Sequence, residues 1–258
     1  MKPALLLAVV VLAGCVTPDV VSQETVRDLA PTGALRAAIN FGNPVLAQKS
    51  ASGEAGGVSV DLARELARRL GVPVELRAYD AAGKVFADAK TGAWDIAFIA
   101  RDPQRANEVE FTAPYVIIEG TYLVPEASPL RTVQDVDRDG LRVAVGRGSV
   151  YDLYLTRTLK HAQLVRAPTS PEAPELFLRD KLDAAAGIRQ QLVQAARQHP
   201  GLRVMPDRFM VIEQAMAVPR GRPLAARYLR EFVDEMKASG FVAASLQKSG
   251  QSEAAVAP

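Results

Sequence analysis

The chain contains a single cysteine, Cys15, so it offers no second thiol for an internal disulfide and no set of thiolates for a metal. It has only two histidines, His161 and His199. Both fall near the ends of expected helices in polar surroundings, which favours helix-end or surface roles over metal ligation. The formal net charge is only +2, with basic and acidic residues interspersed. We therefore expect no metal, no cofactor and no nucleic-acid partner.

Signatures of nucleotide binding and of nucleophilic catalysis are also missing. Residues 146–151, GRGSVY, form a glycine turn, but they lack the Gly-Lys-Ser/Thr ending of a phosphate loop and the full dinucleotide spacing. The chain has no Gly-x-Ser-x-Gly elbow and no His-Glu pair. The sequence therefore shows no nucleophile or acid–base constellation that would point to an enzyme.

Long apolar runs are absent after the first twenty residues. Lys2 precedes ALLLAVVVLA, residues 4–13, which is too short to span a bilayer as a stable helix. Small residues then lead directly to Cys15, and this pattern resembles the lipobox of bacterial lipoproteins. The resemblance implies a signal peptide over residues 1–14, acyl chains on Cys15 and a tether over residues 15–32. The alternative is an ordinary signal peptide with a chance cysteine.

Strand-like and helix-like segments alternate along the first part of the mature chain. Residues 58–71 predict a helix, because apolar residues recur at four-residue spacing and a glycine ends the pattern. A second helical pattern covers residues 82–92. Strand-like runs flank both helices, at residues 35–41, 72–79 and 94–100. This β-α-β-α-β order implies a parallel sheet with helices on its faces.

A second alternation of the same kind covers residues 141–206. Two long extended runs, 115–125 and 209–219, stand on either side of it, and Gly120 interrupts the first run. A long strand with a central glycine can cross between two lobes and bend there. An amphipathic helix over residues 223–240 follows the second run, so we expect the chain to return to the first lobe.

These patterns predict an α/β fold of two lobes joined by two extended hinge crossings. We place lobe 1 at residues 33–119 plus 214–258 and lobe 2 at residues 120–213. The last residues, 251–258, are expected to form a frayed tail. The cleft between two hinged lobes is the natural ligand site.

Four segments of the sequence resemble family 3 of the bacterial extracytoplasmic solute-binding proteins, which serve polar amino-acid ABC transporters. They are GGVSVDLARELARRLGVPVEL, TGAWDIAFIA, DPQRANEVEFTAPY and GLRVAVGRGSVYDLYL, and the likeness covers residues 33–250. The resemblance implies a periplasmic-binding-protein fold of type II, a two-lobe flytrap that closes on its ligand and delivers it to an ABC permease in the inner membrane. It also implies a periplasmic monomer that touches the membrane only through its lipid anchor.

The resemblance further implies positions that contact the ligand. The arginine that holds the ligand's α-carboxylate in family members corresponds to Arg105, and a guanidinium gives two parallel charge-assisted hydrogen bonds to a carboxylate. The start of a lobe 2 helix, at Gly148, Ser149 and Val150, implies backbone N–H groups and a positive helix end for the same carboxylate. Family members often have an aromatic that stacks on the ligand near the first strand, and the nearby candidates are Asn40, Phe41 and Asn43.

Two departures from the family pattern bear on the ligand. Arg101 stands where members usually have serines or threonines, and Arg189 follows Ile188 where an acidic residue usually accepts the ligand's ammonium. We infer an anion, or a carboxylate without a conventionally bound ammonium, such as a keto acid, a dicarboxylate or a modified amino acid. Arg101 and Arg189 either contact this ligand or face solvent as ordinary surface residues. Glu119, in the first crossing, either lines the cleft floor or only satisfies hinge hydrogen bonds.

The leading hypothesis is a lipoprotein of an ABC importer that binds a small carboxylate, such as an amino acid or related organic anion, and is not an enzyme. One alternative is a periplasmic dehydratase of the cyclohexadienyl dehydratase type on the same scaffold, with Glu119 or Glu213 as general acid. Another alternative is a ligand sensor that presents its closed form to a membrane partner.

Overall fold

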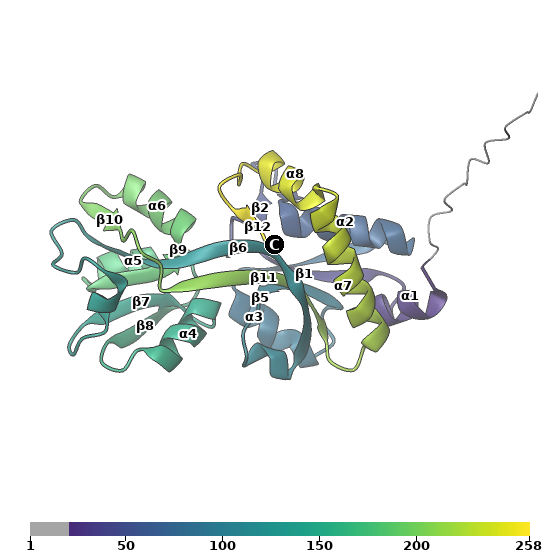
Figure 1. The fold of residues 1–258 in the computed structure, drawn as a ribbon, viewed down its shortest axis with the longest axis horizontal. Helices are drawn as coiled ribbons and strands as arrows, with labels where there is room; N and C mark the ends of the chain where they lie inside the picture. The colour runs from purple at the N-terminus through teal and green to yellow at the C-terminus, as the bar shows by residue number, and fades with distance from the viewer. Residues whose placement is uncertain (1–20) are drawn as a thin grey trace, which may run out of the picture.

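The computed structural model describes residues 21–258, so the expected signal peptide, Cys15 and the first residues of the expected tether lie outside the described range. Two α/β units lie side by side along the long axis of the molecule, and two long strands run from one unit into the other (Figure 1). No helix within residues 21–258 has the length and apolar character needed to cross a membrane.

The longest strand of the described chain has 17 residues, and the predicted order of strands and helices is present. The strands are β1 (Leu35–Asn40), β2 (Gln48–Lys49), β3 (Ala55–Gly56), β4 (Val74–Tyr79), β5 (Ile96–Ala100), β6 (Val109–Pro125), β7 (Arg142–Gly146), β8 (Gln163–Ala167), β9 (Ala184–Ile188), β10 (Leu202–Val204), β11 (Met210–Pro219) and β12 (Ala255–Val256). The α-helices are α1 (Gln23–Leu29), α2 (Val58–Leu70), α3 (Ala82–Ala87), α4 (Val150–Thr158), α5 (Ala173–Arg179), α6 (Arg189–Gln198), α7 (Pro223–Ala238) and α8 (Phe241–Lys248). Short 3-10 helices are η1 (Asp88–Lys90), η2 (Arg105–Asn107) and η3 (Val133–Val136).

One sheet extends through both units, in the order β4-β1-β5-β11-β6-β9-β7-β8. Strand β1 pairs in parallel with β4 and β5, and β7 pairs in parallel with β8 and β9, which confirms the predicted β-α-β arrangement in each unit. We call the unit around β1 lobe 1 and the unit around β7 lobe 2. Strands β6 and β11 are antiparallel and pass between the lobes. The lobe boundaries, at residues 119/120 and 213/214, stay a prediction.

The helix predicted over residues 58–71 illustrates why these elements form. Helix α2 begins after Gly57 and ends at Gly71, whose left-handed backbone (φ 67°) suits a glycine cap. Its apolar stripe, which includes Leu62 and Leu66, is fully buried against lobe 1. Its polar face carries Glu65, Arg68 and Arg69.

Gly120 lies within the long strand β6, where the chain passes between the lobes. It pairs with Ile188 of β9 on one side and with Met210 of β11 on the other. A Cβ atom at this position would lie 2.9 Å from the side chains of both Met210 and Phe209. A side chain at position 120 would therefore have to displace the side chains of Met210 and Phe209 across the crossing strands.

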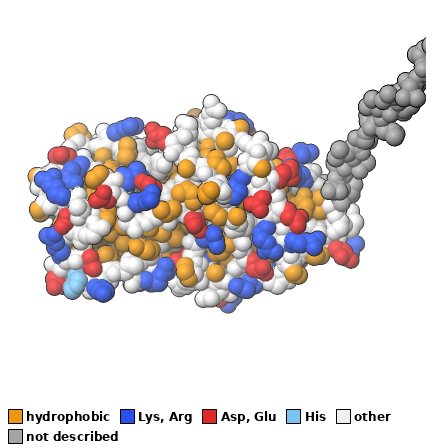
Figure 2. Space-filling view, viewed as in Figure 1, with side chains coloured by type: hydrophobic (Ala, Val, Ile, Leu, Met, Phe, Trp, Pro, Cys, Tyr) orange, Lys and Arg blue, Asp and Glu red, His pale blue; other side chains and the backbone are white. Residues whose placement is uncertain are grey.

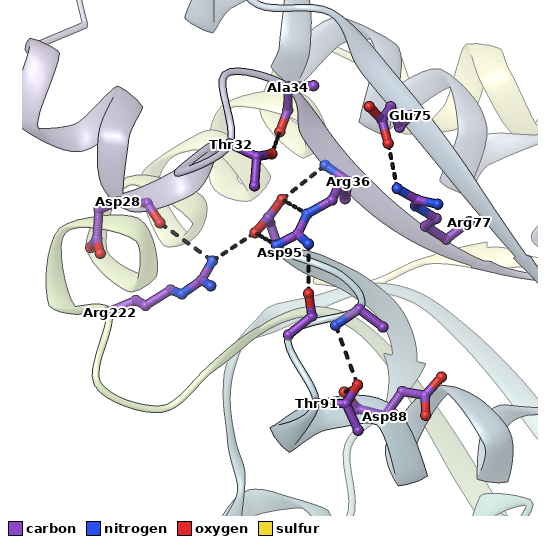
Figure 3. Close-up of polar contacts among 12 residues, drawn as sticks. Asp28, Thr32, Ala34, Arg36, Glu75, Arg77, Asp88, Thr91, Asp95 and Arg222 are labelled. Carbon is purple, nitrogen blue, oxygen red and sulfur yellow. Dashed lines mark hydrogen bonds and ion pairs between the residues drawn. The ribbon is translucent and has the colours of Figure 1, made fainter.

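The buried carboxylate of Asp95 ties three segments of lobe 1 together (Figure 3). Arg36, in β1, donates to it from its backbone N–H (3.0 Å), Nε (2.9 Å) and Nη2 (2.7 Å). Arg222, the residue before α7, donates to it at 3.1 Å and also donates to the carbonyl of Asp28 at 3.5 Å. A fully buried carboxylate needs such partners. The network fixes the start of α7 and thus explains how the chain returns to lobe 1 after β11.

The predicted tether is not irregular throughout, because residues 23–29 form the helix α1. Its first turn is capped by Ser22, whose Oγ accepts a hydrogen bond from the Thr25 N–H at 3.2 Å. Leu29 is fully buried, and α1 packs against α7. The tether prediction is therefore wrong from Ser22 to Leu29, because α7 offers an apolar surface that sequence-local reasoning did not take into account. Residues 15–20 lie outside the described range.

The prediction of a frayed C-terminal tail is also wrong. Strand β12 pairs with Val116 and Ile117 of β6, and Ala257 donates its N–H to the carbonyl of Tyr115 at 3.1 Å. The tail is ordered because it fills an open edge of β6, where unpaired backbone groups would otherwise remain.

The surface shows no broad patch of one charge on the face seen in Figure 2, where lysine and arginine side chains alternate with acidic ones. Apolar side chains gather along the middle of this face, where β6 and β11 pass between the lobes. This face gives no indication of a nucleic-acid surface.

Candidate functional site

A small cavity of about 30 Å³ lies between the two lobes. Lobe 1 and the crossing strands contribute Asn40, Gly42, Asn43, Ala82, Ile99, Ala100, Arg105, Ile212 and Gln214, and lobe 2 contributes Ser149, Val150, Tyr151, Ser170 and Ile188. Since one water needs roughly 10–15 Å³, the lobes in this closed arrangement leave room for only a few non-hydrogen atoms. A larger ligand would need the lobes to stand further apart.

Among residues 21–258, Arg105 is the only charged residue that lines this cavity. It opens the short helix η2 after β5, and it is only 1% exposed. Its Nη1 donates to the carbonyl of Ala100 (2.9 Å) and its Nη2 to the carbonyl of Gly148 in lobe 2 (2.8 Å), while Nε has no partner. Burial lowers the pKa of Arg105 to about 10, so the guanidinium remains a cation at neutral pH. An anionic ligand would supply the hydrogen-bonded carboxylate that this buried cation does not have among residues 21–258.

The start of α4 faces Arg105 from lobe 2. Ser149 is the N-cap, and its Oγ accepts from the N–H of Asp152 at 3.0 Å. The N–H of Gly148 donates to the Asp152 carboxylate at 2.8 Å, and the N–H of Ser149 donates to the carbonyl of Gly146. Of the three N–H groups predicted to hold the carboxylate, only that of Val150 therefore stays available at the helix start. Gly148 takes part through its carbonyl, which accepts from Arg105.

Three residues at the C-terminal end of β1 and in the loop after it were candidates for contact with the ligand, and two of them line the cavity. Asn40 and Asn43 both line the cavity. The Oδ1 of Asn40 accepts from the Gly42 N–H (3.0 Å), and that of Asn43 accepts from the Val45 N–H (3.2 Å), so both amides stabilise the loop after β1. Phe41 does not line the cavity. Its ring is covered by the Lys49 ammonium, which lies 4.9 Å from the ring centroid, so this arrangement does not support a stacking role for Phe41.

Arg101, for which the sequence left both a ligand contact and a surface position open, is not among the residues that line the cavity. Its Nη1 donates to Glu213 at 3.0 Å, and both side chains are nearly half exposed. Residue 213 neighbours Gln214 in β11, and successive strand residues point to opposite faces. Gln214 faces the cavity, so Glu213 and Arg101 lie on the other face of the sheet. The structure supports the surface alternative for Arg101.

Arg189 and Glu119 pair with each other outside the cavity. Arg189 donates from Nε to Glu119 at 2.8 Å, and its remaining donors reach the carbonyls of Met205, Pro206 and Asp207. Hydrogen bonds from Arg208 and Arg189 hold the pKa of Glu119 below its usual value. Both residues line a wider groove of about 820 Å³ between α6 and the C-terminal tail. Their pairing supports the surface alternative for Arg189 and the hinge alternative for Glu119.

Sequence reasoning missed three polar residues that line the cavity, Gln214, Ser170 and Tyr151. Gln214 is the only uncharged polar residue within the strand MVIEQAMAVP and is 4% exposed, so an amide in an apolar strand was an available signal. The Tyr151 hydroxyl is buried without a hydrogen-bond partner, although Ser149 and Ser170 lie nearby, and burial raises its pKa to about 12. It is a further unused donor beside Arg105. Ser170 follows β8, and no sequence pattern marked it.

Two hydrogen bonds join the lobes beside the cavity in addition to the one from Arg105. The Nη2 of Arg157, in α4, donates to the carboxylate of Asp102 at 2.7 Å. The Nε2 of Gln191, in α6, donates to the carbonyl of Gly42 at 3.1 Å. The site is thus closed by contacts between lobes. Within residues 21–258 no cluster of three or more His, Asp or Glu side chains is arranged to hold a metal ion.

Two lobes on two crossing strands, with a cavity between them, define the type II periplasmic-binding-protein fold. An amino acid ABC transporter substrate-binding protein from Streptococcus pneumoniae, solved with L-arginine bound, shares this fold with a TM-score of 0.75. The two chains are 21% identical, and the similarity covers 91% of this chain and 100% of that one.

This chain belongs to the bacterial extracellular solute-binding proteins, family 3, whose sequence model matches residues 35–251. It is similar to the L-cystine-binding protein TcyJ of Escherichia coli, with 21% identity over 94% of this chain and 92% of that protein. It is also similar to the cyclohexadienyl dehydratase of Pseudomonas aeruginosa, with 24% identity over 91% of this chain and 90% of that protein. The family predicted from the four sequence segments is confirmed.

Proposed function

We propose that this chain is the substrate-binding protein of an ABC importer and captures a small carboxylate between its lobes. The observation that carries the proposal is the buried guanidinium of Arg105, whose Nε has no hydrogen-bond acceptor within residues 21–258. The buried Asp102 carboxylate acts on Arg105 through its charge alone, because its ion-pair hydrogen bond goes to Arg157. A ligand carboxylate bonded directly to the guanidinium would offset the remaining free-energy cost of burying it. The amino-acid ligands named for the relatives, L-cystine and L-arginine, each carry a carboxylate, which supports the proposal.

The cavity favours a ligand that has one carboxylate and no bound ammonium. No aspartate or glutamate is among the residues that line it, so a ligand ammonium would have no ionic partner. A dicarboxylate has less support than the sequence suggested, because Arg101 and Arg189 are paired elsewhere and Arg105 is the only cation in the lining. Within the proposed class, a keto acid or an amino acid whose amino group is modified fits the lining best.

The dehydratase alternative has weaker support. A general acid must reach the reacting atom, and neither suggested glutamate lines the cavity. Glu119 is held ionised by Arg189 and Arg208, and Glu213 pairs with Arg101. Incubation of the purified protein with prephenate and with arogenate tests the alternative directly, because formation of an aromatic product would establish the enzyme in place of the carrier.

We also propose that the protein works in the periplasm, anchored to a membrane through acyl chains on Cys15. The proposal rests on the apolar segment and small residues that precede Cys15. Replacement of Cys15 by serine should release the protein from the membrane fraction. The sensor alternative differs only in the membrane partner, so co-purification with either a permease or a sensor protein separates the two.

The test of the carboxylate site is Arg105→Lys, with Arg101→Lys as the matched control. Lysine keeps the charge but loses the two parallel donors, so we expect a ligand affinity loss of about 1.5–3 kcal/mol, or roughly 10- to 100-fold. The measurement is ligand-induced thermal stabilisation across a panel of small monocarboxylates and L-amino acids. Unchanged stabilisation of Arg105→Lys would show that the carboxylate assignment is wrong, and Arg101→Lys should behave like the wild type.

A further inference from the structure

The backbones of the two lobes touch at a pair of glycines. Gly83 is the second residue of α3 in lobe 1, and Gly148 precedes α4 in lobe 2. A Cβ atom on Gly83 would lie 3.1 Å from the Cα of Gly148, and a Cβ on Gly148 would lie 2.8 Å from the Cα of Gly83. A side chain at either position would therefore push the two backbones apart, with the tighter contact at position 148.

Local structure explains a glycine at position 148 but not at position 83. Gly148 has φ +67°, a left-handed conformation that favours glycine on its own account. Gly83 lies inside a helix and does not have a positive φ. Glycine is a poorer helix former than alanine, so its helical position alone would favour alanine. Within residues 21–258, the feature that favours glycine at position 83 is the close approach of the Arg147 and Gly148 backbones of lobe 2.

The glycine contact lies beside the groups proposed to hold the carboxylate. Ala82, the neighbour of Gly83, lines the cavity, and so do Ser149 and Val150, which follow Gly148. The carbonyl of Gly148 also accepts the hydrogen bond from Arg105. The separation of the lobes at the glycines therefore sets the distance between the Arg105 guanidinium and the start of α4.

We propose that Gly83 and Gly148 form a stop whose small size lets the lobes close to this separation, and that this separation favours short carboxylates over longer ones. With the stop engaged, the cavity is only about 30 Å³ and both halves of the anion site meet. A bulkier residue at position 83 would hold the lobes further apart, so a short ligand could no longer reach both. The size limit rests on the proposed function, whereas the stop itself rests only on the contact between lobes.

The informative substitutions are Gly83→Ala and Gly83→Val. The added Cβ would lie 3.1 Å from the Cα of Gly148 and 3.2 Å from the carbonyl oxygen of Arg147. Both are backbone atoms, so they cannot rotate away. Gly56, in β3, supplies matched controls, because no atom lies within 4 Å of a Cβ built there and its φ is not positive. Gly148→Ala is not informative, since it would also strain a left-handed residue.

The first experiment measures lobe separation without ligand, so its outcome does not depend on the proposed function. Spin labels on Ala51→Cys of lobe 1 and Gln198→Cys of lobe 2, both exposed, with Cys15→Ser, report the distance between lobes by double electron–electron resonance. We expect a short-distance population in the unsubstituted protein that Gly83→Val removes and Gly56→Val retains. The stop is overturned if Gly83→Val gives the same distance distribution as Gly56→Val.

The second experiment measures the size limit by calorimetry with two homologous series, straight-chain monocarboxylates and L-2-amino acids. We expect Gly83→Ala and then Gly83→Val to shift the affinity ratio of longer to shorter acids upward, on the order of the tenfold that one methylene gives in a fitted pocket. An unchanged ratio in variants that still bind overturns the size limit. Thermal melting should show variants no less stable than the wild type, because alanine and valine are both better helix formers than glycine.

Discussion

Asp102 of lobe 1 and Arg157 of lobe 2 form an ion pair across the cleft, with 2.7 Å between Oδ2 and Nη2. The Asp102 side chain is only 1% exposed, whereas that of Arg157 is 43% exposed. The other carboxylate oxygen of Asp102 accepts the Gln104 N–H at 2.8 Å, so the acceptor is held in place within lobe 1. The pair is therefore formed only when the lobes are closed.

Arg157→Gln should weaken the closed state without affecting the folding of either lobe. Because Arg157 is partly exposed, we expect a loss of about 1 kcal/mol, or roughly fivefold in ligand affinity. The effect should appear in the dissociation rate, since closure follows encounter. Stopped-flow measurement of ligand release tests this, with Arg179→Gln as control, because Arg179 pairs with Asp180 inside lobe 2. Equal dissociation rates for the two variants would contradict a role in closure.

Gln214→Glu should report whether the ligand carries an ammonium. The substitution keeps the shape of a buried residue that lines the cavity and adds a negative charge beside Arg105. For a ligand with only a carboxylate, the new charge should lower affinity by at least about tenfold, because like charges in a buried site repel. Calorimetry with matched keto acids and amino acids measures the change. A gain in affinity for an amino acid would contradict the inference that no ammonium is bound.

Glu65 links α2 to a pH dependence of stability. Its carboxylate accepts from Arg68 and Arg69, and Arg69 in turn binds Glu235 of α7. The hydrogen bond from Arg68, followed by that from Arg69, lowers the pKa of Glu65 from 4.5 to about 2. Because the folded pKa lies below the unfolded value, this stabilisation is present above pH 4.5 and is lost as the pH falls towards 2.

Glu65→Gln should therefore destabilise the protein at pH 7 and have little effect near pH 2. The pKa shift corresponds to roughly 3 kcal/mol, and solvent around the exposed Arg68 reduces the expected loss to about 2 kcal/mol. Urea unfolding of the wild type and the variant at pH 7 and pH 2.5 measures the difference. Glu231→Gln on the exposed face of α7 is the control. A Glu65→Gln effect of equal size at both pH values would refute the linkage.

Much of the fold followed from local patterns in the sequence. The four-residue spacing of apolar side chains in 58–71 determined α2, because one face of a helix must be buried in any compact fold. The alternation of strand and helix predicted parallel pairing in both lobes, because a helix that connects two strands brings the chain back to start the next strand in the same direction. The prediction of a frayed C-terminal tail was wrong, because the partner strand of the tail, β6, lies more than 100 residues away in the sequence.

The sequence predicted a cavity residue most clearly where the chemistry of a single side chain and a family pattern pointed to the same position. Arg105 could be chosen because a guanidinium before an extended run matched a family pattern, and it does line the cavity. Arg101 pairs with Glu213, Arg189 pairs with Glu119, and the Phe41 ring is covered by Lys49. These contacts decide where the three side chains lie. Sequence periodicity does not show which partner a side chain will choose.

Local sequence patterns and family resemblance were enough to predict the family, the order of elements and Arg105 as the candidate ligand-binding cation. The three-dimensional arrangement of residues 21–258 was needed to show which polar groups share the cavity with Arg105, that no carboxylate of this range is among them, and that Gly83 meets Gly148. The physical reason is the distance along the chain over which each effect acts. Helix and strand periodicity act over a few residues, whereas the distance between two lobes is set by packing and hydrogen bonds between segments far apart in the chain.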